Sequence, residues 1–498
     1  MSKKYDSDFC GNLPLNFINS IQSYGFLFVL NPQLNIIQVS ENLQLFLGEE
    51  VGFFLNKNFD VFLNELFKEE VIDLLRSGKQ NNIPFNFSMM TKKGEVSLLG
   101  IVHVHEKYLL LEVEENKTTN LSNFVFRNVK EVISQLKNCT STQEVLSTAA
   151  IEIKKLSGFD KVMIYQFDTD WNGLVVAEAK EHSMDAYIGL HFPASDVPKQ
   201  ARELYFKNPY RFIPDRSYKP EKLFPVLNPV TFSYTDLSDC NLRAVAPVHL
   251  EYLANMGVET SMSTPIIKED KLWGLISCHH KTSKMLSYEV RTAFELISEL
   301  ISVQLTGKEQ EARLLNDSRM KEIQADIVRK IRRDNNISNS LLGPSPNILD
   351  LLELSGCSIV FKDKITSTGK VPSDNFIHQV IFTILMKKEN NITYYDSFSE
   401  LDPEGAEKEK ASGLIAIPIN DNKGGFILGF REEVVKTVKW GGNPNEAIQF
   451  EENKNTYHPR NSFSIWKETF KDTSLSWNSE TIRAAEVLRI SLNELEVK

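Results

Sequence analysis

Short apolar runs, many of them alternating with polar residues, predict three strand-rich segments along this chain. In the first segment, residues 25–30 and 34–39 form two such runs on either side of the turn Asn31-Pro32-Gln33. Residues 102–113 repeat the pattern with a polar break in the middle, which is typical of a hairpin. We therefore expect a small antiparallel sheet flanked by helices, followed by a linker at the polar stretch 115–120.

A second sheet is predicted between about residues 123 and 305. A helical stretch opens this segment, and runs rich in β-branched and aromatic residues follow at 161–167, 173–179, 264–267 and 272–280. Residues 219–229 contain three prolines, and proline cannot donate to a strand ladder. We expect no regular element in that stretch.

A long helical pattern begins at Tyr288. Its apolar positions recur every three or four residues in two groups separated by a polar interval: Phe294, Ile297 and Ile301, then Met320, Ile323, Ile327 and Ile331. A helix of this length with charged flanks exceeds what one core requires. The pattern indicates a connector between domains and a candidate dimer seam.

The third segment covers roughly residues 336–498. Strand-like runs at 413–419 and 425–430 precede a long excursion at about 435–470, and a helix is predicted at 479–495. We interpret the excursion as a loop without regular structure. A loop of that length in a compact domain is usually functional.

Composition fits several domains and excludes some classes of protein. At roughly 150 residues per domain, 498 residues predict about three domains. A formal net charge of −10 argues against a general nucleic-acid footprint. No apolar run approaches the ~18 residues of a membrane span, and the N-terminus lacks the apolar stretch of a signal peptide. The five cysteines lack paired or metal-ligand spacing, so we expect reduced thiols in a cytoplasmic protein.

The sequence contains no pattern typical of an enzyme. A Gly-rich phosphate loop, an HExxH pair, a nucleophile elbow and the boxes of a histidine kinase are all missing from it. His279 and His280 are adjacent on a predicted strand and would point to opposite faces, which makes a poor metal site. By default His279 is a core histidine, and the aromatic residues Tyr165, Phe192, Tyr205 and Tyr252 are core residues too.

The stretch 191–198 is the strongest local signal for a binding site. Pro193 and Pro198 flank Asp196 and fix the backbone, because proline locks its own φ and restricts the residue before it. Such a turn can present the Asp196 carboxylate to a pocket, although an ordinary helix cap is the competing interpretation. Scattered polar groups on an aromatic, strand-rich scaffold favour a pocket that holds a cofactor over one that turns over a substrate.

Six ordered motifs resemble those of the bacteriophytochrome photosensory core. Residues 193–198 are similar to the PASDIP motif of that family, with Val197 in place of Ile. Residues 242–258 resemble its central pocket helix, and residues 272–280 resemble its LWGLIACHH strand. In the third segment, the family's WGGxP, PRxSF and WxE motifs are matched in order by residues 440–444, 459–463 and 466–468.

The resemblance implies an α+β fold of three mixed domains. A PAS domain with its N-terminal segment would occupy residues 1–120, a bilin-binding GAF domain residues 121–310, and a PHY domain residues 311–498. Each would be an antiparallel sheet flanked by helices, joined through the long helix. Residues 435–470 would form the hairpin-like extension of the PHY domain called the tongue.

The resemblance also implies a linear tetrapyrrole chromophore. Plant and cyanobacterial phytochromes attach it to a Cys just before the pocket His, where this chain has Val248. Bacterial members use an N-terminal Cys upstream of an IQPHG motif, which Cys10 and residues 21–25 match except that Ser23-Tyr24 replace Pro-His. Biliverdin IXα, joined to Cys10 by a thioether, is therefore implied. A partly ionised thiol facing the pocket would be needed.

Individual pocket residues carry over from the family by motif. Arg211 and Arg243 resemble the guanidinium clamps of the bilin propionates, and Tyr205, Ser261 and Ser263 would add hydroxyl groups there. The Asp196 carbonyl and His249 resemble the groups that hold the pyrrole nitrogens through a shared water. His279 resembles the donor to the ring D carbonyl, in a cavity walled by Met163, Tyr165, Phe192 and Tyr252.

The mechanism implied is photoisomerisation of the C15=C16 bond between rings C and D. Asp196 would pair with Arg460 of the tongue in the dark, with Ser462 as a further candidate anchor. On illumination the pair would break and the tongue would refold from strand to helix, which is a two-state switch.

The resulting interpretation is a red/far-red photoreceptor module that forms a homodimer. We expect no catalytic activity in this chain, and signalling to a histidine kinase or another output partner, without nucleic acid or membrane. The alternative is a small-molecule sensor built from PAS and GAF domains without photochemistry, and a third class is a dimerisation scaffold. Cys10 and the tongue motifs favour light sensing, because neither alternative needs a reversible Asp–Arg contact.

Overall fold

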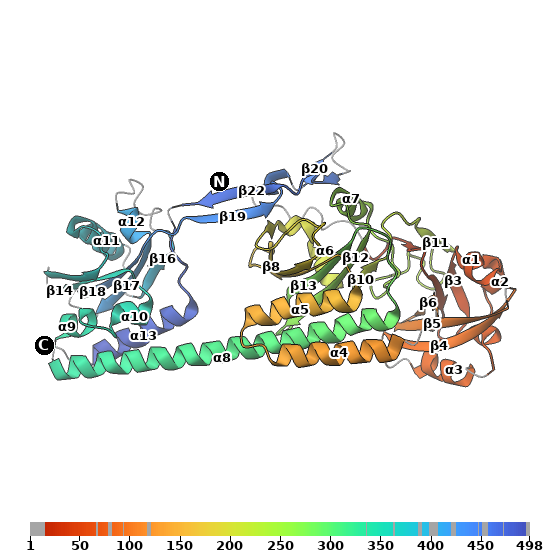
Figure 1. Cartoon of the computed structure of the whole chain (residues 1–498), viewed down its shortest axis with the longest axis horizontal. Coiled ribbons are helices and arrows are strands. Elements are labelled where there is room, and N and C mark those ends of the chain that lie inside the picture. The colour runs from red at the N-terminus through yellow and green to blue at the C-terminus, as the bar shows by residue number, and fades with distance from the viewer. Residues whose placement is uncertain are drawn as a thin grey trace. The chain divides into compact units, whose positions relative to one another are not determined.

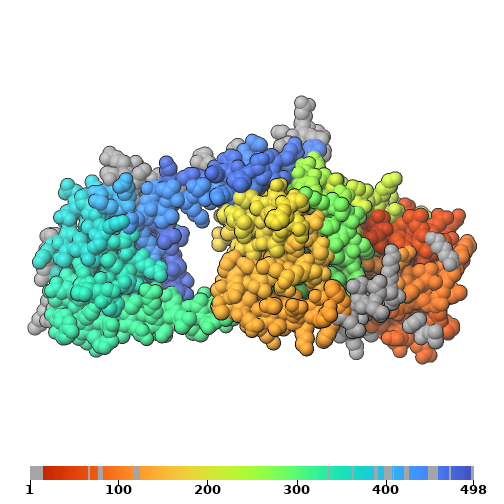
Figure 2. All heavy atoms as spheres, viewed as in Figure 1, coloured from red at the N-terminus to blue at the C-terminus, as the bar shows by residue number. Residues whose placement is uncertain are grey.

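The computed structural model describes most of the chain, in two compact units (Figures 1 and 2). The described residues are 15–65, 68–77, 82–92, 94–116, 121–334, 336–361, 364–386, 391–397, 407–419, 425–446, 448–450, 457–471 and 473–494. The first unit comprises the chain up to Lys308 together with Lys439–Trp466, and the second comprises Glu309–Val438 with Lys467–Lys498. Cys10 and part of the expected linker at 115–120 lie outside the described residues.

The N-terminal part of the first unit is a seven-stranded antiparallel sheet. Its order is β1-β11-β3-β2-β6-β5-β4, with β1 (Ser20–Ile21), β2 (Phe26–Leu30), β3 (Ile36–Ser40), β4 (Ile83–Thr91), β5 (Gly94–Val104), β6 (Leu109–Glu115) and β11 (Glu221–Phe224). The helical elements α1 (Leu43–Leu47), α2 (Val51–Phe54), η2 (Phe59–Phe62) and α3 (Lys68–Ser77) accompany it. A phenylalanine-rich cluster that includes Phe26, Phe28, Phe54 and Phe59 forms the core.

Strand β11 corrects the expectation that residues 219–229 contain no regular element. Its residues pair with β1 on one side and β3 on the other. Pro220 and Pro225 flank the four residues and do not interrupt the ladder, so no ladder hydrogen bond is lost. Leu223 is fully buried between exposed neighbours, which is the alternation of a strand too short to stand out among prolines.

The N-terminal segment passes between β11 and residues 241–244. The Gln22 amide donates to the Leu242 carbonyl (2.7 Å), and the Ala244 amide donates to the Ser20 carbonyl (2.9 Å). The buried Gln22 side chain donates through Nε2 to the Phe212 carbonyl (3.0 Å). These contacts hold the start of the described chain against the segment that contains Arg243.

The second sheet of the first unit carries the site. Its order is β10-β12-β13-β7-β8-β9-β19-β22, with β7 (Lys161–Phe167), β8 (Gly173–Lys180), β9 (His191–Phe192), β10 (Arg211–Ile213), β12 (Thr260–Lys268), β13 (Lys271–His280), β19 (Lys436–Gly441) and β22 (Ile465–Phe470). Strand alternation assigns its two faces. In β13, Ile276 and Cys278 enter an apolar core, whereas Ser277 and His279 face a cavity on the other side.

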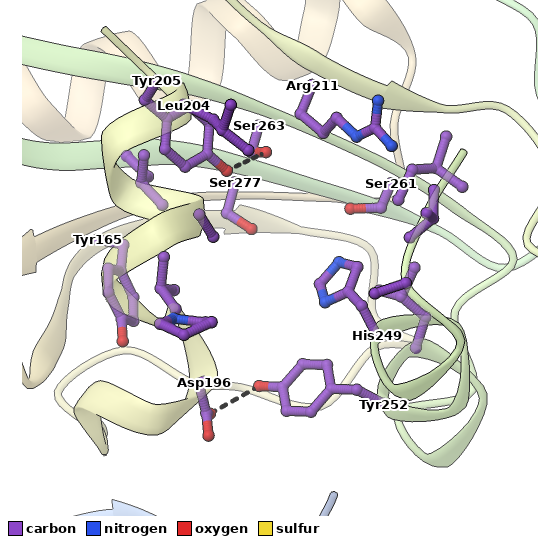
Figure 3. A pocket seen from close by; sticks show the side chains of 18 of the residues that line it. Tyr165, Asp196, Leu204, Tyr205, Arg211, His249, Tyr252, Ser261, Ser263 and Ser277 are labelled. Atoms are coloured by element: carbon purple, nitrogen blue, oxygen red, sulfur yellow. Dashed lines mark hydrogen bonds between the residues drawn. The ribbon is translucent and has the colours of Figure 1, made fainter. Parts of the chain in front are cut away.

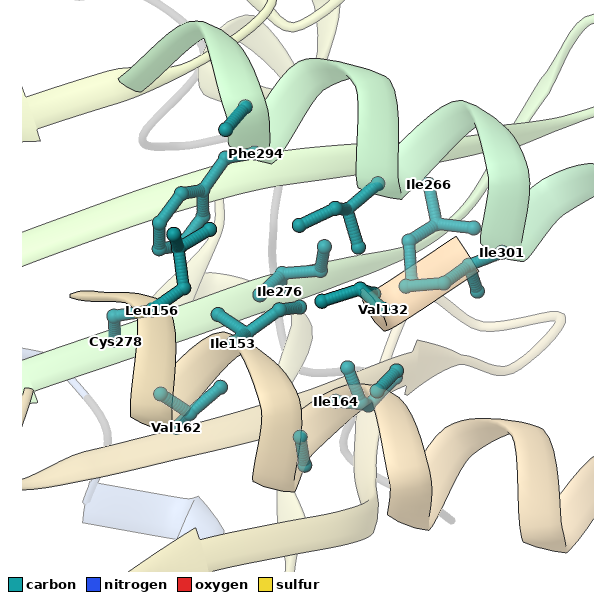
Figure 4. Packing of buried hydrophobic residues seen from close by; sticks show 14 of the residues in the cluster. Val132, Ile153, Leu156, Val162, Ile164, Ile266, Ile276, Cys278, Phe294 and Ile301 are labelled. Carbon is teal, nitrogen blue, oxygen red and sulfur yellow. The ribbon is translucent and has the colours of Figure 1, made fainter. Parts of the chain in front are cut away.

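Helices α4 (Leu121–Lys137), α5 (Thr142–Ser157) and the beginning of α8 (Tyr288–Asp334) cover the apolar face of this sheet (Figure 4). Ser141 caps α5 by accepting from the Glu144 amide, and Gly158 ends it in the left-handed region at φ 64°. Ile153 and Leu156 of α5 and Phe294 and Ile301 of α8 meet the strand residues there.

The two apolar stripes of α8 pack within the chain. Phe294, Ile297 and Ile301 belong to the core just described, and Ile323, Ile327 and Ile331 to a core of the second unit. The continuous helix confirms the predicted element, and its two stripes cover cores of this chain, so they do not themselves form a dimer seam. That the helix takes part in a dimer stays a prediction. A 3–4 spacing specifies a buried face and not whether the covering surface belongs to the same chain.

The second unit contains a five-stranded antiparallel sheet of order β15-β14-β18-β17-β16. These strands are β14 (Gly356–Phe361), β15 (Lys364–Gly369), β16 (Thr393–Tyr395), β17 (Gly413–Ile419) and β18 (Gly425–Arg431). The accompanying helices are α9 (Ile337–Leu342), α10 (Ile348–Leu352), α11 (Asp374–Met386), α12 (Lys408–Ala411) and α13 (Ser479–Glu494). Cores formed by alternate strand residues lie on both faces, which confirms the predicted α+β class.

The excursion between β18 and α13 is not a loop without regular structure, which corrects the prediction. It contains β19, the 3₁₀ turn η5 (Pro444–Glu446), the hairpin of β20 (Ile448–Phe450) and β21 (Tyr457–Pro459), and then β22. Trp440 of β19 pairs in parallel with His191 of β9. The tongue predicted at 435–470 is therefore in a strand conformation here.

Candidate functional site

The predicted pocket residues line a cavity on the face of the second sheet that lies opposite its apolar core (Figure 3). Helix α6 (Lys199–Leu204) and helix α7 (Pro247–Asn255) enclose it together with the strands. The predicted residues that line it are Met163, Tyr165, Phe192, Asp196, Tyr205, Arg211, Arg243, His249, Tyr252, Ser261, Ser263 and His279. Residues from nine separate elements and loops thus converge on one space.

The proline-flanked turn positions Asp196 as a cavity residue. Residues Ala194–Asp196 form a single 3₁₀ turn, and the Asp196 amide donates to the Pro193 carbonyl (3.0 Å). The cap position of α6 is Pro198, and the Asp196 carboxylate accepts from the Tyr252 hydroxyl instead (2.9 Å). The competing interpretation of Asp196 as a helix cap is therefore wrong.

One end of the cavity carries positive charge. Arg211 donates to the Asn241 and Ala244 carbonyls (3.0 Å each), which fixes its guanidinium. Arg243 is 6% exposed, and its Nε and Nη1 have no hydrogen-bond partner among the described residues. Burial, and then the charge of Arg211, lower the pKa of Arg243 to about 9. A buried, unpaired guanidinium is costly, so this end fits a ligand with anionic groups.

Hydroxyl groups complete that end of the cavity. The Tyr205 hydroxyl and Ser263 Oγ share a hydrogen bond of 2.7 Å (Figure 3). Ser261 and Ser263 are both on β12, two residues apart, so strand alternation brings them to the same face. These groups can orient an anion beside the two arginines.

Two neutral imidazoles line the cavity as well. Burial lowers the pKa of His279 to about 3 and that of His249 to about 4, so both rings are uncharged at neutral pH. His279 Nδ1 has no partner within the described part of the chain, and its Nε2 lies 3.4 Å from Ser277 Oγ. A neutral imidazole with an unused ring nitrogen can donate to, or accept from, a polar group of a ligand.

Aromatic residues wall the cavity. Tyr165 contacts Phe192, with ring centroids 6.1 Å apart, and its buried hydroxyl lacks a partner among the described residues. A Cβ on Gly173 would lie 1.6 Å from the Tyr165 ring, so only glycine permits this ring position. Burial raises the pKa of Tyr165 well above its ordinary value.

Tyr187 and Ser277 are among the cavity residues that the sequence analysis missed. Tyr187 lines the wall and contacts Phe192 edge-on at 5.7 Å, but it lies in a turn where no periodicity identifies it. Ser277 could have been found, because it lies two residues before His279 on β13 and so faces the same side. Tyr24, which replaces the usual His, is partly buried near Arg291 and is not among the cavity-lining residues.

The excursion contacts the rim of the cavity through Arg460. Arg460 Nη2 donates to Asp196 Oδ2, the same oxygen that accepts from Tyr252. The guanidinium lies 4.8 Å from the Phe463 ring centroid and 5.5 Å from that of Phe192. The structure thus brings Asp196 and Arg460, 264 positions apart, into one ion pair.

The ionisation of this pair follows from opposed effects. Burial raises the pKa of Asp196, whereas Arg460 and the Tyr252 hydroxyl act in the opposite direction. Burial also acts to lower the pKa of Arg460, but the Asp196 carboxylate outweighs it and the net shift is upward. Arg460 therefore stays charged, and its guanidinium opposes the effect of burial on the Asp196 carboxylate.

Further polar contacts attach β21 and the following residues to α7. Asn255 Nδ2 donates to the Arg460 carbonyl (3.2 Å), and His458 Nδ1 lies 2.9 Å from Glu251 Oε2. Ser462 is exposed, and its hydroxyl accepts from the Ser464 amide (3.3 Å) without reaching Asp196. The role of Ser462 as a second anchor is therefore not seen in this conformation.

Three family models match consecutive parts of the chain. They are described as the PAS fold for residues 10–116, the GAF domain for residues 141–305 and the phytochrome region for residues 320–497. The crystal structure of a bacteriophytochrome from the photosynthetic bacterium R. palustris superposes with a TM-score of 0.85 at 33% identity, over 97% of this chain and 98% of that one. The chain belongs to the phytochrome family.

Other phytochromes are similar over nearly the whole chain. The photosensory core module of the Stigmatella aurantiaca phytochrome has a TM-score of 0.81 at 34% identity, covering 98% of this chain and 97% of that one. Cyanobacterial phytochrome B of Nostoc sp. is 36% identical over 97% of this chain, and the bacteriophytochrome of Pseudomonas aeruginosa is 32% identical over 98%. The chain spans 65% and 66% of the lengths of these two relatives.

Membership gives the general chemistry of the cavity. Phytochromes are photoreceptors that carry a linear tetrapyrrole, and the paired arginines, neutral histidines and aromatic wall fit such a group.

Within the described ranges, no helix is long and apolar enough to cross a membrane.

Proposed function

We propose that this chain is a red/far-red photosensory module that holds biliverdin IXα in the cavity. The observation that carries the proposal is the polar lining of the cavity, which combines Arg211 and the buried Arg243 with the neutral imidazoles of His249 and His279. A bilin has two propionates and a terminal lactam carbonyl, which the arginines and a neutral histidine can pair with. When bound, the bilin supplies light absorption and isomerisation of its C15=C16 bond.

The chain's own residues would bind and orient this group. Arg211 and Arg243 would pair with the propionates, and a charge-assisted pair would satisfy the unused nitrogens of Arg243. His249 and the Asp196 carbonyl would face the pyrrole nitrogens. His279 would hydrogen-bond the ring D carbonyl, and the wall around Tyr165 would limit water and ring movement.

Cys10 is the proposed attachment residue. Cys139, Cys240, Cys278 and Cys357 are all buried, and burial raises the pKa of Cys240 and Cys278 well above the ordinary value, which disfavours the reactive thiolate. Val248 lines the cavity and cannot form a thioether. Leu15 also lines the cavity, and five residues can span up to roughly 17 Å, so the length of chain before Leu15 would let a thiol at position 10 reach the bilin.

The Asp196–Arg460 pair is proposed as the dark-state anchor of the tongue. Its contacts sit on the cavity rim, so a change in the wall at Phe192 or Tyr252 would reach the guanidinium directly. Loss of the pair would release β21 and allow the tongue to refold toward helix. We propose that the module forms a homodimer, acts as a sensor without catalysis of its own, and signals to a histidine kinase or another output partner.

A difference spectrum tests the proposal. The purified chain would be mixed with biliverdin, and absorption recorded before and after red and then far-red light. Reversible exchange between a red and a far-red band is expected. Stable binding without photoconversion would favour the small-molecule sensor, and no binding at all would contradict both.

A further inference from the structure

Lys161 is a buried cation beside the cavity that the proposed binding roles do not use. It opens β7 and is 1% exposed, although lysine is rarely buried without a partner. In the sheet it lies opposite His279 of β13, and it shares the cavity face of β7 with Met163 and Tyr165. A cation on this face therefore lies next to His279.

The contacts of Lys161 bind it to the aromatic wall. Lys161 Nζ lies 3.5 Å from the centroid of the Tyr187 ring, which is close for a cation over an aromatic face. It also lies 3.9 Å from Glu178 Oε1, which accepts from the Tyr187 amide (2.9 Å). Lys161, Glu178 and Tyr187 thus form one buried cluster, and Tyr187 in turn contacts Phe192.

We propose that Lys161 is a positioning residue that controls the surroundings of His279 in the cavity through its charge. The ammonium holds the Tyr187 ring in the wall and disfavours a second positive charge on the neighbouring His279. This inference rests on the proposed function, because ring D would turn beside His279. Lys161 acts through Tyr187 and His279 and does not itself line the cavity among its described residues.

The charge of Lys161 can change in a mildly alkaline range. Burial lowers its pKa to about 8, against opposing effects of Glu178 and Asp185. The other charged groups that act on it are Lys180 and Lys281, which lower the pKa further. The pKa of His279 is lowered by burial first and by Lys161 next. As the pH rises through about 8, the fraction of charged Lys161 falls and the cation–ring attraction is expected to weaken.

A structural lysine that only joins β7 to β8 is the competing interpretation, and the chain without chromophore distinguishes the two. Lysine labelled with ¹³C at Cε would be followed by NMR between pH 6 and 11, with Lys161→Met giving the assignment. We expect the Lys161 signal to titrate near pH 8 and to carry a ring-current shift that disappears in Tyr187→Leu. Titration with the surface lysines near 10.4, or no ring-current shift, would overturn the proposal.

The biliverdin-loaded chain tests the consequence for the site. Absorption and photoconversion yield would be measured from pH 6.5 to 9.5. The wild type should change with a midpoint near pH 8. Lys161→Arg, which stays charged, should keep the low-pH behaviour throughout, and Lys161→Met should resemble the high-pH wild type at every pH.

Lys271→Met is the matched control, because Lys271 is an exposed lysine on β13 and its loss should leave the profile unchanged. An unaltered pH profile in both Lys161 variants would refute the positioning role. Failure of the wild type to bind or convert biliverdin would refute the proposed function instead, while the NMR result would stand independently. If Lys161→Met does not fold, Lys161→Arg and Tyr187→Leu carry the test.

Discussion

At the scale of single residues, the cavity combines groups whose ordinary charges are altered by burial. Arg243 is buried with unused nitrogens, and His249 and His279 are buried in their neutral forms. Each would be unfavourable in an empty apolar site, since buried polar groups are normally hydrogen-bonded. These residues are placed to pair with the polar groups of a ligand. Without the ligand, their burial lowers the stability of the folded chain.

Attachment gives the first prediction. Cys10→Ser should abolish covalent biliverdin, because the four other cysteines are buried, and burial raises the pKa of the Cys240, Cys278 and Cys357 thiols. Denaturing electrophoresis with zinc-induced fluorescence measures the bond. Cys240→Ala and Cys278→Ala should retain the fluorescent band, and a band that persists in Cys10→Ser would exclude this attachment.

Acid stability gives the second prediction. The unfolded chain binds protons at His249 and His279 below about pH 6.5, whereas the folded chain does not until about pH 4 and 3. Stability is therefore present above pH 6.5 and lost as pH falls, by up to about 1.4 kcal/mol per pH unit for each histidine. Urea unfolding of the chromophore-free chain between pH 4 and 7 should show a shallower slope in His249→Gln and His279→Gln.

His182→Gln serves as the control, since His182 is exposed and its loss should not change the slope. The same slope in all three variants would mean that the two cavity histidines become protonated in the folded state.

At the scale of elements, the sequence predicted those strands and helices whose pattern has one explanation. Strands β7 and β17 and the start of α8 fall where the apolar runs placed them. Strand β11 and the strands of the excursion did not stand out, because prolines and turns shorten their alternation. The α8 stripes were assigned to the wrong partner, because a pattern of buried positions does not identify the covering surface.

The site shows the same division. Motifs identified Asp196, Arg243 and His279, all of which line the cavity. Tyr187 and Lys161 were not identified, since a turn tyrosine has no periodicity and a lysine at a strand end is normally taken as exposed. The contact between Lys161 and Tyr187 depends on the packing of β7, β8 and the turn before β9, which the sequence pattern does not show.

The tongue gives the third prediction, at the scale of elements. Asp196→Asn and Arg460→Ala each leave a buried group uncompensated, which costs about 3–5 kcal/mol for a buried pair. Each change should increase hydrogen exchange of the amides at 457–464 in the chromophore-free chain. The double variant should be little worse than either single one, because one contact is lost only once.

Ser462→Ala should leave exchange unchanged, since its hydroxyl contacts only the Ser464 amide in this conformation. Strictly additive effects in the Asp196–Arg460 cycle would show that the two side chains are not energetically coupled.

At the scale of the whole molecule, a buried ion pair joins the N-terminal sheet to the long helix within the first unit. Arg291 of α8 is fully buried and donates through Nη1 and Nη2 to the two carboxylate oxygens of Glu114 on β6 (2.9 and 2.5 Å). Burial acts to lower the pKa of Arg291, but the Glu114 carboxylate contributes to a net upward shift. Arg291 therefore stays charged. The helix that continues into the second unit is thus fixed at its start by one specific contact.

This pair gives the fourth prediction. Arg291→Met leaves the Glu114 charge buried and should lower the free energy of unfolding of the first unit by about 3–5 kcal/mol. Adding Glu114→Leu should restore most of the loss, since an apolar pair of similar volume replaces the ionic one. Urea unfolding followed by circular dichroism measures both. A double variant as unstable as Arg291→Met would mean that the pair's geometry, and not its charge balance, holds the two elements together.

The position of residues 20–22 between β11 and residues 241–244 has a consequence for synthesis on the ribosome. Gln22 is 219 positions ahead of Asn241, one of its hydrogen-bond partners. At about 5–20 residues per second, the nascent N-terminal segment waits roughly 10–45 s before its partner exists. During that time β1 has neither neighbour, and a chaperone or a free bilin could meet the segment that carries Cys10 before the fold closes around it.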